Sequence, residues 1–172
     1  SLITENQEAF ASKLEIAAFN QARDLYEQGT KQVELKEFKQ DVLKEQFEQA
    51  ALAFLDFVSE FPESENVASA LINAGLIYEA NLGKAEKANE LYERFVNEFP
   101  CHEKAKNYYF RIANNYESTF NFEKAITYYE ALMREFPDHV DAPVALFNAA
   151  FLKTGMGDHL GAARAYERYG KE

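Results

Sequence analysis

One pattern of residues recurs along the chain at an interval of 37 to 38 residues. Three aromatic–proline pairs are spaced by 38 and 37 residues: Phe61-Pro62, Phe99-Pro100 and Phe136-Pro137. A repeat of this length corresponds to one small supersecondary unit, which cannot bury its apolar face alone. The chain is therefore expected to fold as a stack of similar units rather than as one closed globule.

The residues before each proline share a further pattern. Alanine lies twelve positions upstream, an aromatic residue eight upstream and a bulky apolar residue five upstream. Offsets of four and seven from the alanine place these side chains on one face of a helix, and proline ends that helix because it pushes the preceding residue out of the α region. The copies are Ala50, Phe54 and Phe57, then Ala88, Tyr92 and Phe95, then Ala125, Tyr129 and Leu132, and finally Ala162, Tyr166 and Tyr169.

Another helix is predicted ahead of each of these. It has a small residue at one position (Gly75, Ala113, Ala150) and a large residue three positions later (Tyr78, Tyr116, Lys153). Two helix backbones can approach closely at a small residue. Turn residues follow, namely Gly83, Asn121 and Gly157-Asp158, with one extra residue near Leu82-Gly83 that explains the longer interval. Each repeat is therefore predicted to be a helical hairpin.

Over roughly residues 14–172 the repeats resemble tetratricopeptide (TPR) repeats. The resemblance rests on the small–x–x–large helix, the Gly or Asn turn, the Ala–x3–aromatic helix and the terminal proline. The usual period is about 34 residues, and here three residues are added after each proline. Such lengthened repeats are similar to those of bacterial cell-envelope TPR proteins, for example the β-barrel-assembly lipoprotein and the Tol–Pal-associated periplasmic protein. The resemblance implies an all-α fold, a TPR-like α-solenoid of about four helical hairpins in a right-handed superhelix.

The whole chain, residues 1–172, is expected to form a single solenoid. The first repeat contains an insert near 29–41, in which Val33, Leu35, Phe38 and Val42 have helical spacing. We expect this insert to extend the second helix backwards, with a break at Gly29. Another aromatic–proline pair would fall just beyond Glu172, so we interpret the chain as a fragment of a longer protein. The expected repeats cover about 5–62, 63–100, 101–137 and 138–172.

The charge balance argues against several classes of partner. Lys and Arg total 18 and Asp and Glu total 29, for a net charge of -11, which disfavours nucleic acid and anionic lipid. No apolar run approaches the length of a transmembrane helix, so no direct membrane insertion is expected. The single cysteine is compatible with both cytoplasm and periplasm, and the resemblance favours the periplasm or cell envelope.

No motif typical of an enzyme is present. Cys101-His102 follows Pro100, and His139 takes the equivalent place after Pro137. We interpret both histidines as parts of a recurring junction rather than as metal ligands or members of a Cys–His pair. We expect no catalytic residue, no metal site and no cofactor.

The resemblance also implies which residues face a partner, because the first helix of each TPR hairpin lines the concave side. An apolar row would contain Ile72, Phe110 and Phe147, with Leu76 and Phe151 beside it. A polar row would contain Asn73, Arg111 and Asn148, and an acidic row would contain Glu27, Glu79 and Glu117. The candidate partner-binding residues are Ile72, Asn73, Leu76, Glu79, Phe110, Arg111, Asn114, Glu117, Phe147, Asn148 and Phe151.

Two interpretations of these rows stay open. The rows can form a groove for a peptide or helix with apolar anchors and some positive charge. Alternatively, Phe110 and Phe147 pack between neighbouring helices and the glutamates form a solvated surface, which contributes little to stability.

The sequence thus predicts a non-catalytic protein–protein interaction scaffold that binds a partner's peptide or helix on its concave face. The expected setting is a bacterial multi-protein assembly, with the envelope favoured. An alternative is a regulatory module in which a bound peptide or ligand reshapes the superhelix. End-to-end self-association through the open ends of the solenoid is a further interpretation.

Overall fold

The computed structural model describes residues 2–35 and 40–169, with side chains described at 8–33 and 40–167. Within these residues the chain forms helices and connecting turns without a strand. It divides into two compact units, Ser1–Leu91 and Tyr92–Glu172, and each unit is described by itself. No helix among the described residues is both long enough and apolar enough to cross a membrane.

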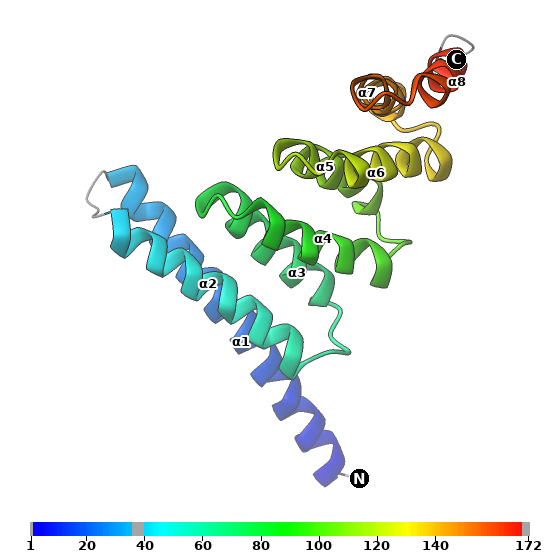
Figure 1. The fold of residues 1–172 in the computed structure, drawn as a ribbon. Coiled ribbons are helices and arrows are strands. Elements are labelled where there is room, and N and C mark those ends of the chain that lie inside the picture. Colours follow the sequence, from blue (N-terminus) through cyan, green and yellow to red (C-terminus); the bar gives the residue numbers. More distant parts are fainter. Residues whose placement is uncertain (1, 36–39, 170–172) are drawn as a thin grey trace. The chain divides into compact units, whose positions relative to one another are not determined.

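The helices follow one another as hairpins (Figure 1). The first unit contains α1 (Leu2–Leu35), α2 (Gln40–Glu60), α3 (Val67–Leu76) and the π-helical turn η1 (Ile77–Asn81). Helix α4 (Ala85–Glu98) begins in the first unit and ends in the second. The second unit continues with α5 (Ala105–Ser118), α6 (Phe122–Glu135), α7 (Ala142–Gly155) and α8 (His159–Tyr169).

The helix boundaries reproduce the sequence repeat. Helices α3, α5 and α7 begin at residues 67, 105 and 142, and helices α4, α6 and α8 begin at 85, 122 and 159. The residues eight and five positions before each proline are at most 1% exposed in the first three copies. The small residues Gly75, Ala113 and Ala150 are also buried. The apolar face predicted from the spacing is therefore the face that forms the core.

A recurring set of hydrogen bonds joins each hairpin to the following one. In each junction the Phe N–H donates to the carbonyl four residues earlier, and the Phe carbonyl accepts from the residue three positions later. That later residue is Ser64, His102 or His139, and its side chain accepts the backbone N–H two residues on, at 3.0, 3.1 and 3.2 Å respectively. Both histidines are thus parts of the recurring junction, as the sequence predicts.

The tight turns inside the hairpins share one left-handed residue. The backbone φ angle is positive at Gly83 (65°), Phe120 (61°) and Gly157 (83°), which are equivalent positions. The sequence assigns Asn121 to the turn of the middle hairpin, and it does not single out Phe120. The Asn121 side chain caps α6 by accepting the Lys124 N–H, whereas Phe120 adopts the left-handed conformation.

The extra residue of the 38-residue interval is accommodated by η1. After α5, the Asn121 N–H donates to the carbonyl of Tyr116, five residues earlier. In the preceding hairpin the equivalent bond runs from the Lys84 N–H to the carbonyl of Tyr78, six residues earlier. π-helix occurs mostly as a single turn within an α-helix, and here that turn contains the added residue. The insertion therefore lies just before the predicted Leu82-Gly83 turn.

The insert near 29–41 lengthens both helices of the first hairpin. The predicted helix break at Gly29 is absent, because α1 continues through this residue to Leu35. A Cβ atom at Gly29 would lie 3.0 Å from Phe47 Cε1, so the glycine allows close packing of α1 on α2. The predicted backward extension is found in α2, which begins at Gln40. Phe38 lies outside the described residues.

Candidate partner-binding surface

The hydroxyl of Tyr129 organises the predicted polar residues of the second unit. It lies 2.5 Å from Asn114 Oδ1 and 2.7 Å from Glu117 Oε2, both on α5. The side chain of Asn148, on α7, also hydrogen-bonds to this hydroxyl. Burial, followed by the hydrogen bond to Glu117, raises the pKa of Tyr129 above its ordinary value. The phenol therefore stays protonated at neutral pH and holds side chains from two first helices together.

The polar row packs against the aromatic residue of the preceding second helix. Arg111 and Asn148 occupy equivalent positions on α5 and α7. The Arg111 guanidinium lies 5.8 Å from the ring centroid of Tyr92, in the geometry of a cation–π contact, and Asn148 hydrogen-bonds to Tyr129. These two side chains connect neighbouring hairpins and leave less of their polar surface for a partner.

The aromatic residues of this surface differ in exposure. Phe110 is half-buried with its ring centroid 5.6 Å from that of Tyr129. Phe147 makes the equivalent contact with Tyr166, at 5.9 Å, but is 44% exposed. Phe151, one turn later on α7, is 62% exposed. Packing therefore accounts for Phe110, whereas α7 presents two aromatic rings to solvent.

We name this surface the α5–α7 face. It consists of two exposed aromatic residues and the half-buried Phe110 beside a fixed polar cluster, a combination that is common at the centre of protein interfaces. Its members are Phe110, Asn114, Glu117, Phe147, Asn148 and Phe151.

The first unit contains a cavity of about 300 Å³ between its first helices. We name it the α1–α3 cavity. Its lining includes Asn73 and Leu76, both predicted, and Glu27 of the predicted acidic row. Glu27 and Arg23 form an exposed ion pair at 3.6 Å. The remaining lining residues are Tyr26, Phe54 and Ile77.

The other two predicted residues of the first unit lie differently. Ile72 is only 6% exposed, so its side chain belongs to the core. Glu79 is half-buried in η1. The structure thus brings Glu27, Asn73 and Leu76 together in one unit, and Asn114, Glu117 and Asn148 together in the other.

Sequence reasoning did not assign Tyr129, Tyr26 and Phe54 to the surface. Tyr129 and Phe54 are the aromatic residues eight positions before proline, which the spacing places in the core. Tyr129 is indeed fully buried as a residue. The tyrosine at this position is the feature of the sequence that could have indicated the polar cluster, because a buried tyrosine hydroxyl usually forms a hydrogen bond with a polar partner.

The described residues contain no group of three or more His, Cys, Asp or Glu side chains placed to hold a metal ion. Cys101 is exposed. His139 Nε2 lies 2.8 Å from Asn107 Oδ1 on α5, and the His102 ring packs edge-on against Phe95 at 5.3 Å. His139 Nδ1 also lies 3.8 Å from Asp141 Oδ2. The contacts of both histidines therefore stay within the junction and the helices beside it.

Comparison with known sequences identifies two of the hairpins. Residues 69–100 and 107–139 each match the tetratricopeptide repeat family. No curated protein sequence matches the chain.

Solved structures give the fold of the chain as a whole. A tetratricopeptide repeat protein from Parabacteroides merdae ATCC 43184 is similar with a TM-score of 0.56 and 20% identity, over 85% of this chain and 51% of that one. BtubC (BKLC) from P. vanneervenii has a TM-score of 0.54 and 19% identity, over 89% and 72%. A Podosopora anserina protein with nearly identical TPR-like repeats has a TM-score of 0.53 and 15% identity, over 97% and 93%.

These comparisons confirm the predicted all-helical, TPR-like solenoid fold, and the two matched repeats support a place in the TPR family. The chain spans about half the length of the Parabacteroides protein.

Proposed function

We propose that this chain, with its tetratricopeptide repeats, is a non-catalytic protein–protein interaction scaffold that binds an extended peptide or helix of a partner on its first helices. TPR folds suggest this class of function, and the α5–α7 face is the location that we propose for it. The observation that supports the location is the exposure of Phe147 and Phe151, at 44% and 62%, beside the polar cluster around Tyr129.

The geometry favours a partner with apolar anchors and backbone groups that can be hydrogen-bonded. The two rings on α7 provide contact area with few rotatable bonds, so ordering them on binding costs little entropy. Asn114 and Asn148 are held in place by Tyr129 before any partner arrives. Preorganised polar groups of this kind raise affinity because their ordering cost is already met.

A peptide library displayed on phage, with tyrosine omitted, tests this proposal on the 172-residue chain. Selected peptides should bind about tenfold or more weakly to the double variant Phe147→Ala, Phe151→Ala, because truncation of an interface hot spot costs about 2 kcal/mol or more. The matched control is Leu160→Ala, which removes an exposed apolar side chain from α8. Equal affinity of wild type and the double variant would reject the proposed location.

The lengthened repeats and their Phe–Pro junctions lead us to place the scaffold in a bacterial cell-envelope assembly. Fractionation of cells that produce the full-length protein tests the compartment, and recovery only with cytoplasmic proteins would contradict it. Light scattering over a range of protein concentrations tests end-to-end self-association, which requires the measured mass to rise with concentration.

The α1–α3 cavity supports a second candidate function, the binding of a regulatory ligand. Its volume of about 300 Å³ lies at the lower end of the range of small-molecule sites, and its lining combines aromatic rings with Arg23 and Asn73. Thermal-shift screening of a small-molecule fragment library against wild type and Leu76→Trp tests this function. Hits that raise the melting temperature of both proteins equally would contradict a ligand in this cavity.

A further inference from the structure

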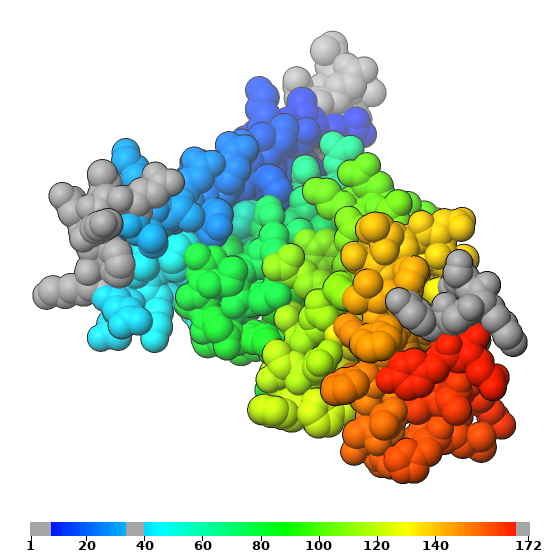
Figure 2. Space-filling model, turned by 90° about the horizontal axis from the view of Figure 1, so that it is seen from above, coloured from blue at the N-terminus to red at the C-terminus, as the bar shows by residue number. Residues whose placement is uncertain are grey.

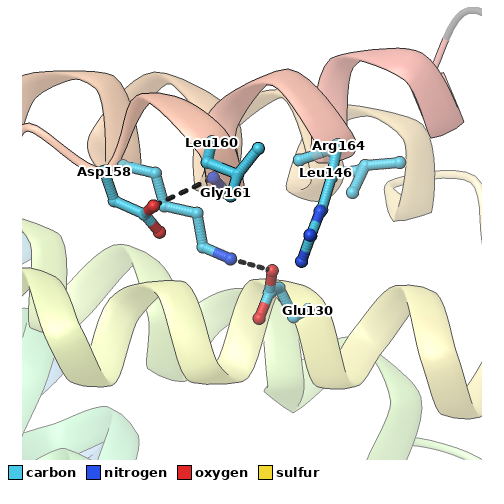
Figure 3. Close-up of a pocket in the computed structure, with 8 residues that line it drawn as sticks. Glu130, Leu146, Asp158, Leu160, Gly161 and Arg164 are labelled. Atoms are coloured by element: carbon cyan, nitrogen blue, oxygen red, sulfur yellow. Dashed lines mark hydrogen bonds and ion pairs between the residues drawn. The ribbon is translucent and has the colours of Figure 1, made fainter.

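The last hairpin contains a second cavity, on the side formed by its second helix. It has a volume of about 440 Å³ and lies between α6, α7 and α8 (Figure 3). We name it the α6–α8 pocket. The Glu130 carboxylate accepts a hydrogen bond from Lys153 Nζ at 2.6 Å across it. Arg164 and Leu160, both exposed residues of α8, form its outer wall, and the Arg164 guanidinium points toward Glu130.

The equivalent space in the preceding hairpin is filled with tyrosine rings. Tyr116 and Tyr128 stack with their ring centroids 6.0 Å apart, and Tyr109 lies 6.1 Å from Tyr128. Lys124 covers the Tyr116 ring at 4.6 Å. In the last hairpin the positions of Tyr109, Tyr116, Lys124 and Tyr128 are occupied, in order, by Leu146, Lys153, Gly161 and Ala165.

All four replacement residues line the pocket. The pocket is therefore the volume that the absent tyrosine rings and lysine side chain would occupy. The residues of α7 and α8, orange and red in Figure 2, form the last hairpin that the structure describes.

The glutamate that binds the tyrosine hydroxyls in the preceding hairpin is also present beside the pocket. In the preceding hairpin Glu93 accepts a hydrogen bond from Tyr116 at 2.6 Å and another from Tyr128. Glu130 occupies the equivalent position on α6 and accepts from Lys153. Glu130 is therefore the counterpart of the Glu93 carboxylate, which accepts a hydrogen bond from the Tyr128 hydroxyl. Ala165 stands at the position of Tyr128 and has no hydroxyl to donate.

The cap of α8 keeps the pocket open. Asp158 Oδ1 accepts the Gly161 N–H at 2.9 Å, as Asn121 accepts the Lys124 N–H in the preceding hairpin. A Cβ atom at Gly161 would lie 2.0 Å from Asp158 Oδ2. A side chain at Gly161 therefore requires the Asp158 carboxylate to shift. Gly161 itself has no side chain to take the place of the lysine that covers the ring in the preceding hairpin.

We propose that the α6–α8 pocket binds a tyrosine side chain of a partner protein. The ring takes the place of Tyr128, its hydroxyl donates to Glu130, and the guanidinium of Arg164 contacts the ring face in a cation–π arrangement. This surface is separate in location from the α5–α7 face, and the proposal does not depend on it.

Titration of the isotope-labelled 172-residue chain with N-acetyl-tyrosinamide, followed by two-dimensional amide NMR, tests the proposal. Saturable shifts are expected around Glu130, Gly161 and Ala165, with a dissociation constant in the millimolar range, on the order of 1 mM. N-acetyl-leucinamide should bind at least tenfold more weakly. No saturable shifts, or equal shifts with both compounds, would overturn the proposal.

Two variants locate the binding. Ala165→Tyr restores the ring of the preceding hairpin and should abolish the shifts, whereas Ala163→Tyr adds a ring at an exposed position of α8 outside the pocket and should leave them unchanged. Arg164→Ala alters only an exposed side chain and should weaken binding several-fold even if Ala165→Tyr does not fold. Binding retained in both Ala165→Tyr and Arg164→Ala would place the ligand elsewhere and overturn the assignment.

Discussion

Phe120 occupies a backbone conformation that costs energy for any residue except glycine. Its φ angle is 61° and its side chain is 80% exposed, so little packing offsets the strain. The equivalent positions in the neighbouring hairpins are Gly83 and Gly157. An exposed aromatic residue at such a position is a candidate for interaction, because stability alone would favour glycine.

Phe120→Gly should therefore raise the free energy of unfolding relative to Phe120→Ala by about 1 kcal/mol. Alanine removes the same ring but keeps the left-handed strain, so it is the matched control. Urea denaturation followed by circular dichroism measures the difference. A Phe120→Ala variant at least as stable as Phe120→Gly would show that backbone strain at this position does not limit stability.

Glu48 forms a charge network in the first unit. Its carboxylate accepts a hydrogen bond from Lys84 Nζ, lies 3.7 Å from Lys87 Nζ and accepts from the Tyr78 hydroxyl at 3.3 Å. The hydrogen bond from Lys84 lowers the pKa of Glu48 below its ordinary value, with a smaller opposing effect from burial. The ionised carboxylate therefore stabilises the folded state.

Because the folded-state pKa is lowered, this stabilisation is present above the unfolded-state pKa of glutamate and is lost as the pH falls through the folded-state pKa. Glu48→Gln should lower the free energy of unfolding at pH 7 by roughly 1 kcal/mol or less, and its difference from wild type should shrink in acid. Denaturation curves between neutral and acidic pH check this. Glu45→Gln, an exposed position on the same helix, is the control. A difference that does not change with pH would contradict the role of the charge.

At the scale of elements, the spacing of a few residues was sufficient to predict most helices. Proline fixes the end of each second helix, and the alanine–aromatic spacing fixes its buried face. The first hairpin was predicted less well, because no proline lies between residues 1 and 61. Gly29 resembles a helix breaker in the sequence, but tertiary packing against Phe47 keeps it helical.

The π-helical turn shows a different limit of prediction. The repeat interval reveals that one residue is added between Tyr78 and Lys84. Whether the turn or the helix absorbs the added residue depends on local hydrogen bonding. Here the Leu82 N–H donates to the Ile77 carbonyl at 3.1 Å, five residues earlier, so the helix absorbs it.

The small residue of each first helix should be intolerant of bulk. Gly75 is buried in α3, and a leucine there should lower the free energy of unfolding by about 1–3 kcal/mol through overpacking. Ala80→Leu is the matched control, since Ala80 is exposed in η1. Thermal denaturation of both variants tests the alignment of the repeats, and equal melting temperatures for Gly75→Leu and wild type would contradict it.

At the scale of the whole molecule, a repeat sequence predicts which residues are equivalent but not how each copy differs. The residues of the α5–α7 face were predicted from the TPR pattern. Their unequal exposure was not predicted, because the exposure of Phe110 and Phe147 depends on what packs beside each ring. The α6–α8 pocket was missed although Lys153 was aligned with Tyr116. The sequence indicates this pocket only when four aligned positions are compared together, because their combined side-chain volume is smaller in the last hairpin than in the preceding one.

The proposed scaffold receives its partner's peptide on first helices rather than on second helices. A selected peptide without tyrosine, carrying a nitroxide spin label at its centre, tests this directly through broadening of the amide NMR signals of the 172-residue chain. Broadening is expected on α5 and α7, at Asn114, Asn148 and Phe151, with the signals of Leu160 and Arg164 on α8 much less affected. Broadening centred on α6 and α8, with the α5–α7 face unaffected, would contradict the proposed binding surface.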